Sequence, residues 1–211
     1  MDFVRARSQE QINRRQEEII DACDILFERY GYEGVNFKVI SEMTSITRPT
    51  LYNYYSTKDE ILLDLLQREI LHWQIGLMQE METTPVMTKT QYSTFLTDQF
   101  ASHDKMMKLL SILFTFLENN SRVEKLAPFK TDVMNVLGTV AASVDQYFPE
   151  SSAEKKAIFV SAFFAYIVGL YPMANLTEKQ LEAIQRAGAN YVQPDFRQMC
   201  HNGILLLLSD L

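Results

Sequence analysis

The chain contains few of the residues that crosslink or interrupt a fold. Its 211 residues include two cysteines, seven glycines and six prolines. Cys23 and Cys200 form no CxxC pair, so the sequence indicates neither a disulfide framework nor a zinc site, and it fits a reducing cytoplasm. Scarce glycine and proline, with few alternating runs of β-branched residues, predict an all-α protein.

No segment has the composition of a targeting or membrane-spanning sequence. The first residues carry Asp2, Arg5 and Arg7 and no apolar core, which argues against a signal peptide. The longest apolar run, residues 157–171, stops at Pro172 and is shorter than the ~20 residues that a spanning helix needs. We therefore interpret it as a buried core helix and expect no membrane partner.

Catalytic and cofactor motifs are also absent. His72, His103 and His201 are scattered, without HExxH, and the chain has no GxGxxG, P-loop or GxSxG. Each of these motifs carries a known chemistry. Cys200 and His201 are neighbours, but adjacent helical residues point in different directions and cannot form a nucleophile–base pair. The sequence therefore predicts no enzyme, no metal and no cofactor.

The most informative stretch, residues 37–58, reads FKVISEMTSITRPTLYNYYSTK. Phe37, Ile40 and Met43 recur at a spacing of three, which predicts one face of a short helix. After a break, Thr47 has the chemistry of an N-cap, and a proline is tolerated in the helical turn that follows. The stretch predicts a helix, a tight turn and a second short helix.

The second of these helices is expected to turn Leu51, Tyr52 and Tyr55 inward. Its outward residues carry hydroxyls, an amide and a guanidinium: Thr47, Arg48, Thr50, Asn53 and Tyr54. Such a helix is typical of the reading helix of a helix-turn-helix. Taken alone, the same residues are equally consistent with an ordinary solvated helix face.

Residues 19–62 resemble the N-terminal domain of the TetR (tetracycline-repressor-like) family of bacterial transcription regulators. The matching residues follow the family's order and spacing: Leu26, Phe27, Gly31, Tyr32, Ile40, Thr50, Leu51, Tyr52, Lys58 and Asp59. Ser41 and Ser45 stand where the family usually has Ala and Gly, and Pro49 where it often has Gly. The resemblance implies a homodimer that binds a palindromic double-stranded DNA operator and usually represses transcription.

Seven residues are the candidates for DNA contact: Lys38, Thr47, Arg48, Thr50, Asn53, Tyr54 and Lys58. We expect Thr47 and Lys58 to meet phosphate, and Arg48 and Asn53 are the side chains best able to read guanine and adenine edges. The net charge of −7 predicts weak binding to random DNA, because phosphate neutralisation supplies most non-specific affinity.

Four further bases lie among the first fifteen residues: Arg5, Arg7, Arg14 and Arg15. They are expected to follow the DNA backbone or the minor groove. For Arg5 and Arg7, a solvated tail is an equal alternative.

We expect two domains, a helix-turn-helix DNA-binding domain over residues 1–57 and a helical ligand-binding and dimerisation domain over residues 58–211. A long helix from Lys58 to about Met81 joins them, so a ligand that displaces its far end would tilt the reading helix. Further helices are expected over residues 90–102, 105–119, 123–148 and 153–172, with two more after residue 177. Capping boxes are expected at Thr57, Ser151 and Thr177.

The resemblance implies a pocket for an apolar or amphipathic small molecule of unknown identity in the second domain. Met and aromatic side chains line adaptable pockets well. The candidates, from a group that also includes Met78 and Met81, are Trp73, Phe95, Phe100, Met107, Phe114, Met134 and Tyr166. For any one of them, a place in the plain core is the simpler interpretation.

Ser161, Ala165 and Gly169 recur every four residues, and such a small-residue stripe lets another helix approach closely. The partner is either the last helix of the same chain or a second copy. The resemblance favours the dimer, because the family pairs its last two long helices with their copies. The candidate interface residues are Phe159, Ser161, Ala162, Ala165, Gly169, Leu205 and Leu208.

A helical protein-interaction or small-molecule-binding module without DNA regulation is the alternative function. It would explain the helices and a pocket, but not the sequence of residues 31–58.

Overall fold

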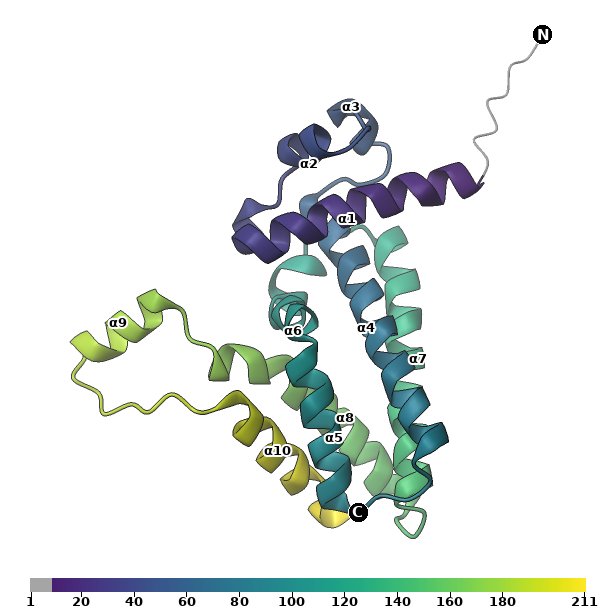
Figure 1. Ribbon diagram of the computed structural model, residues 1–211, viewed down its shortest axis with the longest axis vertical. Helices are drawn as coiled ribbons and strands as arrows, with labels where there is room; N and C mark the ends of the chain where they lie inside the picture. The colour runs from purple at the N-terminus through teal and green to yellow at the C-terminus, as the bar shows by residue number, and fades with distance from the viewer. Residues whose placement is uncertain (1–8) are drawn as a thin grey trace. The chain divides into compact units, whose positions relative to one another are not determined.

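The computed structural model describes residues 9–211, and in this range the chain forms helices and no strand (Figure 1). The predicted all-α class is confirmed. Contacts group the chain into two compact units: Met1–Arg68 with Phe114–Phe129, and Glu69–Leu113 with Lys130–Leu211. This grouping differs from the two consecutive segments expected from the sequence, because part of the middle of the chain packs with the N-terminal helices.

The first unit is built on α1, whose apolar stripe meets the helices that follow it. Its elements are α1 (Gln9–Gly34), α2 (Phe37–Met43), α3 (Arg48–Leu51), the start of α4 (Lys58–Thr83), most of the π-helical turn η1 (Leu113–Leu117) and the start of α7 (Val123–Tyr147). Its buried core includes Ile19, Cys23, Leu26, Phe27, Ile40, Leu51 and Tyr55. Gly31 has φ 63°, a left-handed conformation that glycine adopts without strain, so the regular helix is interrupted there.

The second unit contains the remaining parts of α4 and α7 and five further helices. These are α5 (Lys89–Ser102), α6 (Asp104–Ser111), α8 (Ala153–Ala174), α9 (Glu178–Arg186) and α10 (Phe196–Leu207), followed by the 3-10 turn η2 (Leu208–Asp210). α10 packs against α5 and α8, and α6 packs against α8. α9 buries none of its residues, and Figure 1 shows it standing apart from these helices.

Two helices end at residues other than those predicted. The helix expected over residues 105–119 stops at Ser111 and gives way to η1, where Asn119 donates its side-chain amide to two backbone carbonyls (2.9 and 3.2 Å). The helix expected to end at Pro172 continues to Ala174. Pro172 therefore lies inside the helix, although proline removes a backbone hydrogen bond and crowds the preceding turn.

The predicted helix caps are confirmed in part. Thr177 forms the expected capping box. α8 is capped by Ser152, one residue after the expected Ser151. Thr57 accepts the N–H of Glu60 (3.2 Å), but the capping box is incomplete because the Glu60 carboxylate bonds other groups.

The start of α4 carries three carboxylates that join the parts of the first unit: Asp59, Glu60 and Asp64. Asp59 accepts the hydroxyl of Tyr32, which lies on α1 (2.8 Å). Asp64 accepts the hydroxyl of Tyr55 (2.7 Å) and the ammonium of Lys125, which lies on α7 (2.8 Å). Negative charge is favourable at a helix N-terminus, so the first turn of α4 also stabilises Asp59 and Glu60.

Glu60 is fully buried. The guanidinium of Arg122 donates to it from Nε (2.7 Å) and Nη2 (2.9 Å), and the backbone N–H of Ser56 donates to it at 2.6 Å. Burial by itself would raise the pKa of Glu60, but the hydrogen bonds from Arg122 and Ser56 outweigh burial. They hold the pKa below its ordinary value of 4.5, so the carboxylate stays charged in the folded protein.

Because the pKa of Glu60 is lower in the folded protein than in the unfolded chain, its carboxylate stabilises the folded state at pH values above the unfolded-state pKa. This stabilisation is lost as the pH falls below 4.5 and through the folded-state pKa. We predict that Glu60→Gln has an unfolding free energy that varies less with pH below 4.5 than that of the wild type. At neutral pH the free energy of unfolding of the variant should be roughly 2 kcal/mol lower than that of the wild type. This loss is smaller than the cost of breaking a fully buried pair, because Arg122 is half-exposed.

Chemical denaturation from about pH 3 to about pH 7 measures both effects. The control is Glu17→Gln, which removes an exposed carboxylate of α1. The assignment is wrong if the wild type and Glu60→Gln lose stability in parallel as the solution is acidified.

Candidate functional site

α2, the following turn and α3 form a helix-turn-helix, as the sequence predicts. The side chain of Asn36 caps α2 by accepting a backbone N–H (3.0 Å). α3 is a single turn, but backbone hydrogen bonds continue as far as Tyr55, whose N–H donates to the carbonyl of Leu51 (3.0 Å). Thr47 precedes α3, yet its side chain caps no backbone N–H and pairs with the hydroxyl of Thr50 (2.9 Å).

The turn between the two helices holds Ser45 at the position where the TetR pattern usually has glycine. No non-glycine residue within 9–211 has a positive φ, so this turn does not require glycine. The carboxylate of Glu18, on α1, accepts both the backbone N–H and the hydroxyl of Ser45, the hydroxyl at 2.9 Å. α1 therefore fixes the turn that sets the direction of α3.

The residues proposed to meet DNA lie mostly at the surface. Lys38, Thr47, Arg48 and Asn53 are exposed, and Thr50 is partly exposed. They come from α2, the end of the turn, α3 and the residues directly after α3. The structure therefore gathers a base on α2 with a guanidinium, hydroxyls and an amide around α3, a set able to donate to phosphates and base edges.

Of the four basic residues nearest the N-terminus, the structure places two. Arg14 and Arg15 are exposed on α1. Arg5 and Arg7 lie outside the described residues.

Two tyrosines beside α3 differ from expectation. Tyr52, predicted to face inward, is 52% exposed and packs edge-on against Phe37 (centroids 4.7 Å apart). Successive helical residues are roughly 100° apart, so the residue after the buried Leu51 cannot share its inward direction. Tyr54, predicted to lie at the DNA, is half-buried, and its buried hydroxyl has no hydrogen-bond partner in the described chain. That hydroxyl reaches DNA only if the side chain moves.

Lys58, also predicted to meet phosphate, already has partners within the first unit. Its ammonium donates to the backbone carbonyl of Tyr32 (2.9 Å), lies 3.7 Å from the centroid of the Tyr32 ring and is 3.8 Å from a carboxylate oxygen of Glu33. Substitution of Lys58 would therefore disturb α1 as well as any DNA contact.

The structure places the seven predicted pocket residues in different surroundings. Trp73 stacks on Phe100 (5.2 Å), and both are buried in the core of the second unit, as is Met107. Phe114 is half-exposed and belongs to the first unit. Tyr166 donates its hydroxyl to the carbonyl of Met199 (2.6 Å), and burial raises its pKa to about 12. Phe95 is half-buried. Met134 alone of the seven lines the groove described next.

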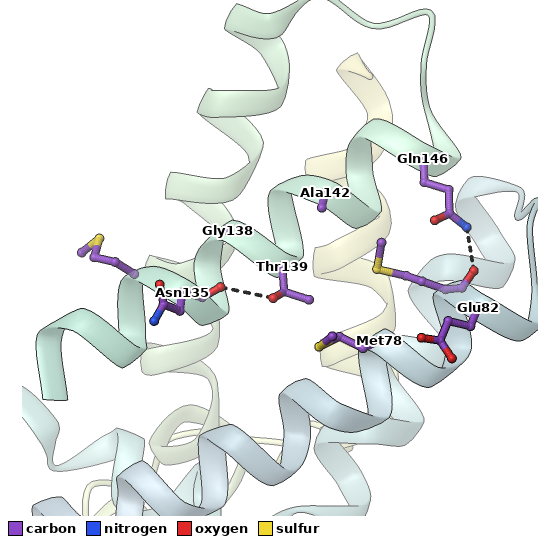
Figure 2. A pocket seen from close by; sticks show the side chains of 9 residues that line it. Met78, Glu82, Asn135, Gly138, Thr139, Ala142 and Gln146 are labelled. Atoms are coloured by element: carbon purple, nitrogen blue, oxygen red, sulfur yellow. Dashed lines mark hydrogen bonds between the residues drawn. The ribbon is translucent and has the colours of Figure 1, made fainter. Parts of the chain in front are cut away.

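An open groove of about 510 Å³ lies between α4 and α7 in the second unit (Figure 2). It is lined by Met78, Met81, Glu82, Met134, Asn135, Gly138, Thr139, Ala142 and Gln146. Gln146 donates to the carbonyl of Met81 (2.9 Å), and Gln74 donates to the hydroxyl of Thr139 (2.7 Å). Three thioethers give the groove an adaptable apolar lining, and the carboxylate and amides give it polar groups that can orient a ligand.

Part of the lining of this groove has a local sequence signal. Met78 and Met81 are one helical turn apart, and Gly138 and Ala142 are small residues at the same face of α7. The two helices are distant in sequence, and no local pattern shows that they lie together.

The predicted dimer residues fall into three groups by exposure. Phe159 and Leu208 are buried within the chain's own core. Ser161, Ala165 and Gly169 are exposed along one face of α8. A Cβ added at Gly169 would meet no atom within 4 Å, so the face is open along this stripe; the remaining two, Ala162 and Leu205, are half-buried.

α8 is more exposed than expected, because the sequence predicted a buried core helix over these residues. Within the described chain it is the one helix long and apolar enough to cross a membrane by length and composition, and 28% of its most apolar stretch is buried. The expectation of a buried helix is therefore wrong for most of its surface. One such helix is weak evidence for a membrane span, because an apolar face of this kind equally marks a protein interface.

No group of three or more potential metal ligands occurs among residues 9–211.

Comparison with known families covers nearly the whole chain. Residues 19–65 match the model described as bacterial regulatory proteins, tetR family, and residues 67–209 match the model described as tetracyclin repressor-like, C-terminal domain. The HTH-type transcriptional activator FasR of Mycolicibacterium smegmatis is 26% identical over 113 residues, which are 54% of this chain and 44% of FasR. The chain thus matches less than half the length of this relative.

Two solved structures share the fold. FadR of Thermus thermophilus, a TetR-family transcriptional repressor in complex with lauroyl-CoA, is 15% identical with a TM-score of 0.61, covering 93% of this chain and 95% of FadR. The transcriptional regulator FadR of Bacillus subtilis, in complex with stearoyl-CoA, is 15% identical with a TM-score of 0.54, covering 92% and 98%. At these identities the likeness concerns the fold.

Proposed function

We propose that this chain, which belongs to the tetR family of bacterial regulatory proteins and is a transcription regulator, is a homodimeric repressor. In this proposal it binds a palindromic operator and leaves it when an apolar or amphipathic small molecule binds. The observation that carries the proposal is the helix-turn-helix with Lys38, Thr47, Arg48 and Asn53 exposed around it. Two such units must enter successive major grooves about 34 Å apart, so the operator should be two-fold symmetric.

Activation of transcription is a second candidate, favoured by one observation. The FasR relative is described as an activator. A reporter driven by the operator-bearing promoter separates the two outcomes: deletion of the regulator raises expression for a repressor and lowers it for an activator.

The proposed dimer uses the exposed small-residue face of α8. Ser161, Ala165 and Gly169 allow close approach of a second helix, and exposed Ile158 and Leu206 supply apolar area beside them. Such a face on a helix this apolar is unfavourable in water unless another surface covers it. A second copy of the same face is self-complementary, as a two-fold interface requires.

We predict that Ala165→Glu converts the dimer to a monomer and abolishes operator binding, because two carboxylates would meet at the symmetric interface. Light scattering coupled to size exclusion measures the mass. Thr94→Glu, on the exposed side of α5, is the control and should remain dimeric. A wild-type chain that runs as a monomer at micromolar concentration, with and without operator, would contradict the proposed dimer.

The proposed DNA contacts are separable by their salt dependence. We predict that Lys38→Ala weakens binding to all sequences alike and lowers the salt slope by about 1, because it removes a phosphate contact. Asn53→Ala should relax base preference with a nearly unchanged slope. Lys38 is a cleaner choice than Lys58, whose ammonium also holds Tyr32. Fluorescence anisotropy over a range of salt, with operator and scrambled duplexes, checks both; indistinguishable variants would refute the assignment.

The proposed effector site is the methionine-lined groove between α4 and α7. Its volume of about 510 Å³ lies within the usual range for small-molecule sites. We propose a long-chain acyl thioester as the effector class, because two structures of the same fold are complexes with lauroyl-CoA and stearoyl-CoA. The apolar thioethers suit an acyl chain, and the polar groups at Asn135 and Gln146 suit an amide-bearing headgroup.

We predict that Gly138→Leu blocks ligand response while leaving operator binding intact. A Cβ at Gly138 would meet no atom within 4 Å, so the variant should fold, and its side chain should fill the groove. Gly138→Ala is the matched control, which leaves room for a ligand. Titration of lauroyl-CoA and stearoyl-CoA into the operator complex should release DNA from the wild type and from Gly138→Ala; equal release from Gly138→Leu would exclude this groove.

A further inference from the structure

The connection that follows the reading helix α3 is linked through Glu60 to Arg122, a residue far along the chain. The polypeptide leaves α3 through residues 52–56 before α4 begins. Ser56, at the end of this connection, donates its N–H to the buried carboxylate of Glu60 (2.6 Å), and Glu60 in turn accepts Nε and Nη2 of Arg122 (2.7 and 2.9 Å). The backbone N–H of Arg122 reaches the same carboxylate at 3.1 Å. One carboxylate thus links the exit of α3 to the start of α7.

Arg122 lies in the segment of residues 114–129, and other contacts also join this segment to the N-terminal helices of the first unit. Thr57 donates its hydroxyl to the carbonyl of Asn120 (2.9 Å). Lys125 bonds Asp64 and lies 4.3 Å from the centroid of the Tyr55 ring. These contacts surround the Glu60–Arg122 pair, so the segment is fixed by several polar bonds and not by one.

We infer that Arg122 is a positioning residue for the DNA-reading helix, and that through it changes in α7 reach the DNA-binding unit. The inference rests on the proposed function. α7 begins at Val123 and later supplies Met134, Asn135 and Gly138 to the groove. A displacement of α7 therefore moves the backbone next to Arg122 and changes the support of Glu60 and Ser56. This connection acts beside α4, which runs from Lys58 toward the groove.

The chemistry of the pair makes it sensitive to such a displacement. A carboxylate that is fully buried cannot remain without its charge partner, because an unpaired buried charge is strongly unfavourable. When Arg122 withdraws, Glu60 must rotate toward water or take up a proton. Rotation removes the acceptor of the Ser56 N–H, and protonation weakens that acceptor because the hydrogen bond is no longer charge-assisted. Either change loosens the connection that follows α3. The planar guanidinium bonds both carboxylate oxygens, which fixes orientation as well as charge.

The chain before Arg122 is suited to adjustment. η1 (Leu113–Leu117) is a π-helical turn, and π-turns are rare and frequently occur at functional sites. Asn119 bonds two of its carbonyls and Ser121 bonds the carbonyl of Leu117 (2.7 Å). Regular α-helix is therefore absent between Ser111 and Val123, and side-chain bonds hold the connection in place.

The test uses Arg122→Gln in the full chain, with Arg186→Gln as the matched control. Arg186 is exposed on α9 and pairs with Glu182 in a surface i,i+4 pair, so it loses the same charge outside the first unit. Hydrogen exchange of the free protein measures the amides of residues 52–56. Operator affinity is measured over a range of salt concentrations, and circular dichroism checks folding.

We expect faster exchange at residues 52–56 in Arg122→Gln alone, and operator binding about tenfold weaker with an unchanged salt slope, the order of effect of a coupled residue that does not touch the ligand. Arg122→Lys keeps the charge but cannot bond both carboxylate oxygens with a planar group. Its exchange rates at residues 52–56 and its operator affinity should lie between those of the wild type and Arg122→Gln. It serves the same test if Arg122→Gln does not fold.

Two results would overturn the inference. A salt slope lowered by about 1 would mean that Arg122 itself contacts phosphate. Unchanged exchange at residues 52–56 in both Arg122 variants would mean that Arg122 does not position this connection. The exchange experiment needs no DNA, so it judges the positioning role even if the wild type binds no operator and the proposed function fails.

Discussion

The first unit depends on a buried negative charge at the start of α4. Glu60 is fully inside the protein and is held by the backbone of Ser56 and the guanidinium of Arg122. Its neighbours Asp59 and Asp64 accept bonds from α1 and from α7. The first turn of α4 adds a favourable dipole interaction for Asp59 and Glu60. The position of α3 is thus set by electrostatic contacts as well as by the apolar core beneath it.

This arrangement has a consequence for regulation. α4 and α7 each contribute residues to both compact units, and the same two helices line the methionine groove. A ligand in that groove contacts the two elements that are covalently continuous with the supports of the reading helix. In the proposed function, ligand and operator are coupled because each biases the same pair of helices, and Arg122 connects α7 to the support of the reading helix.

The fold and the reading helix were accessible from the sequence because their signals are local. The spacing of Phe37 and Ile40 and the capping chemistry of Thr177 act over a few residues, and the structure confirms the corresponding helices. Local patterns were less reliable where a neighbouring turn altered the backbone. Tyr52 follows a buried leucine and faces out, and Pro172 lies inside the last turn of its helix.

The features that the sequence did not reveal are long-range. Glu60 and Arg122 are 62 positions apart, and no periodicity or motif links them. The grouping of residues 114–129 with the N-terminal helices accompanies that pair and the contacts around it, and no local pattern indicates it. The groove has the same origin, since Met78 and Met134 belong to helices that no local pattern brings together. Of the predicted pocket aromatics, Trp73 and Phe100 stack on each other in the core of the second unit.

In the proposed mechanism, ligand binding and operator binding are thermodynamically coupled. Thermodynamic linkage requires each to weaken the other by the same factor, typically about 5- to 150-fold. The most direct measurement is calorimetric titration of an acyl-CoA into the free protein and into its operator complex, paired with operator titrations with and without the acyl-CoA. If ligand and operator are coupled, operator weakens acyl-CoA binding and acyl-CoA weakens operator binding by the same factor, and this factor is greater than one. An acyl-CoA affinity that is the same for the free and operator-bound protein would contradict it.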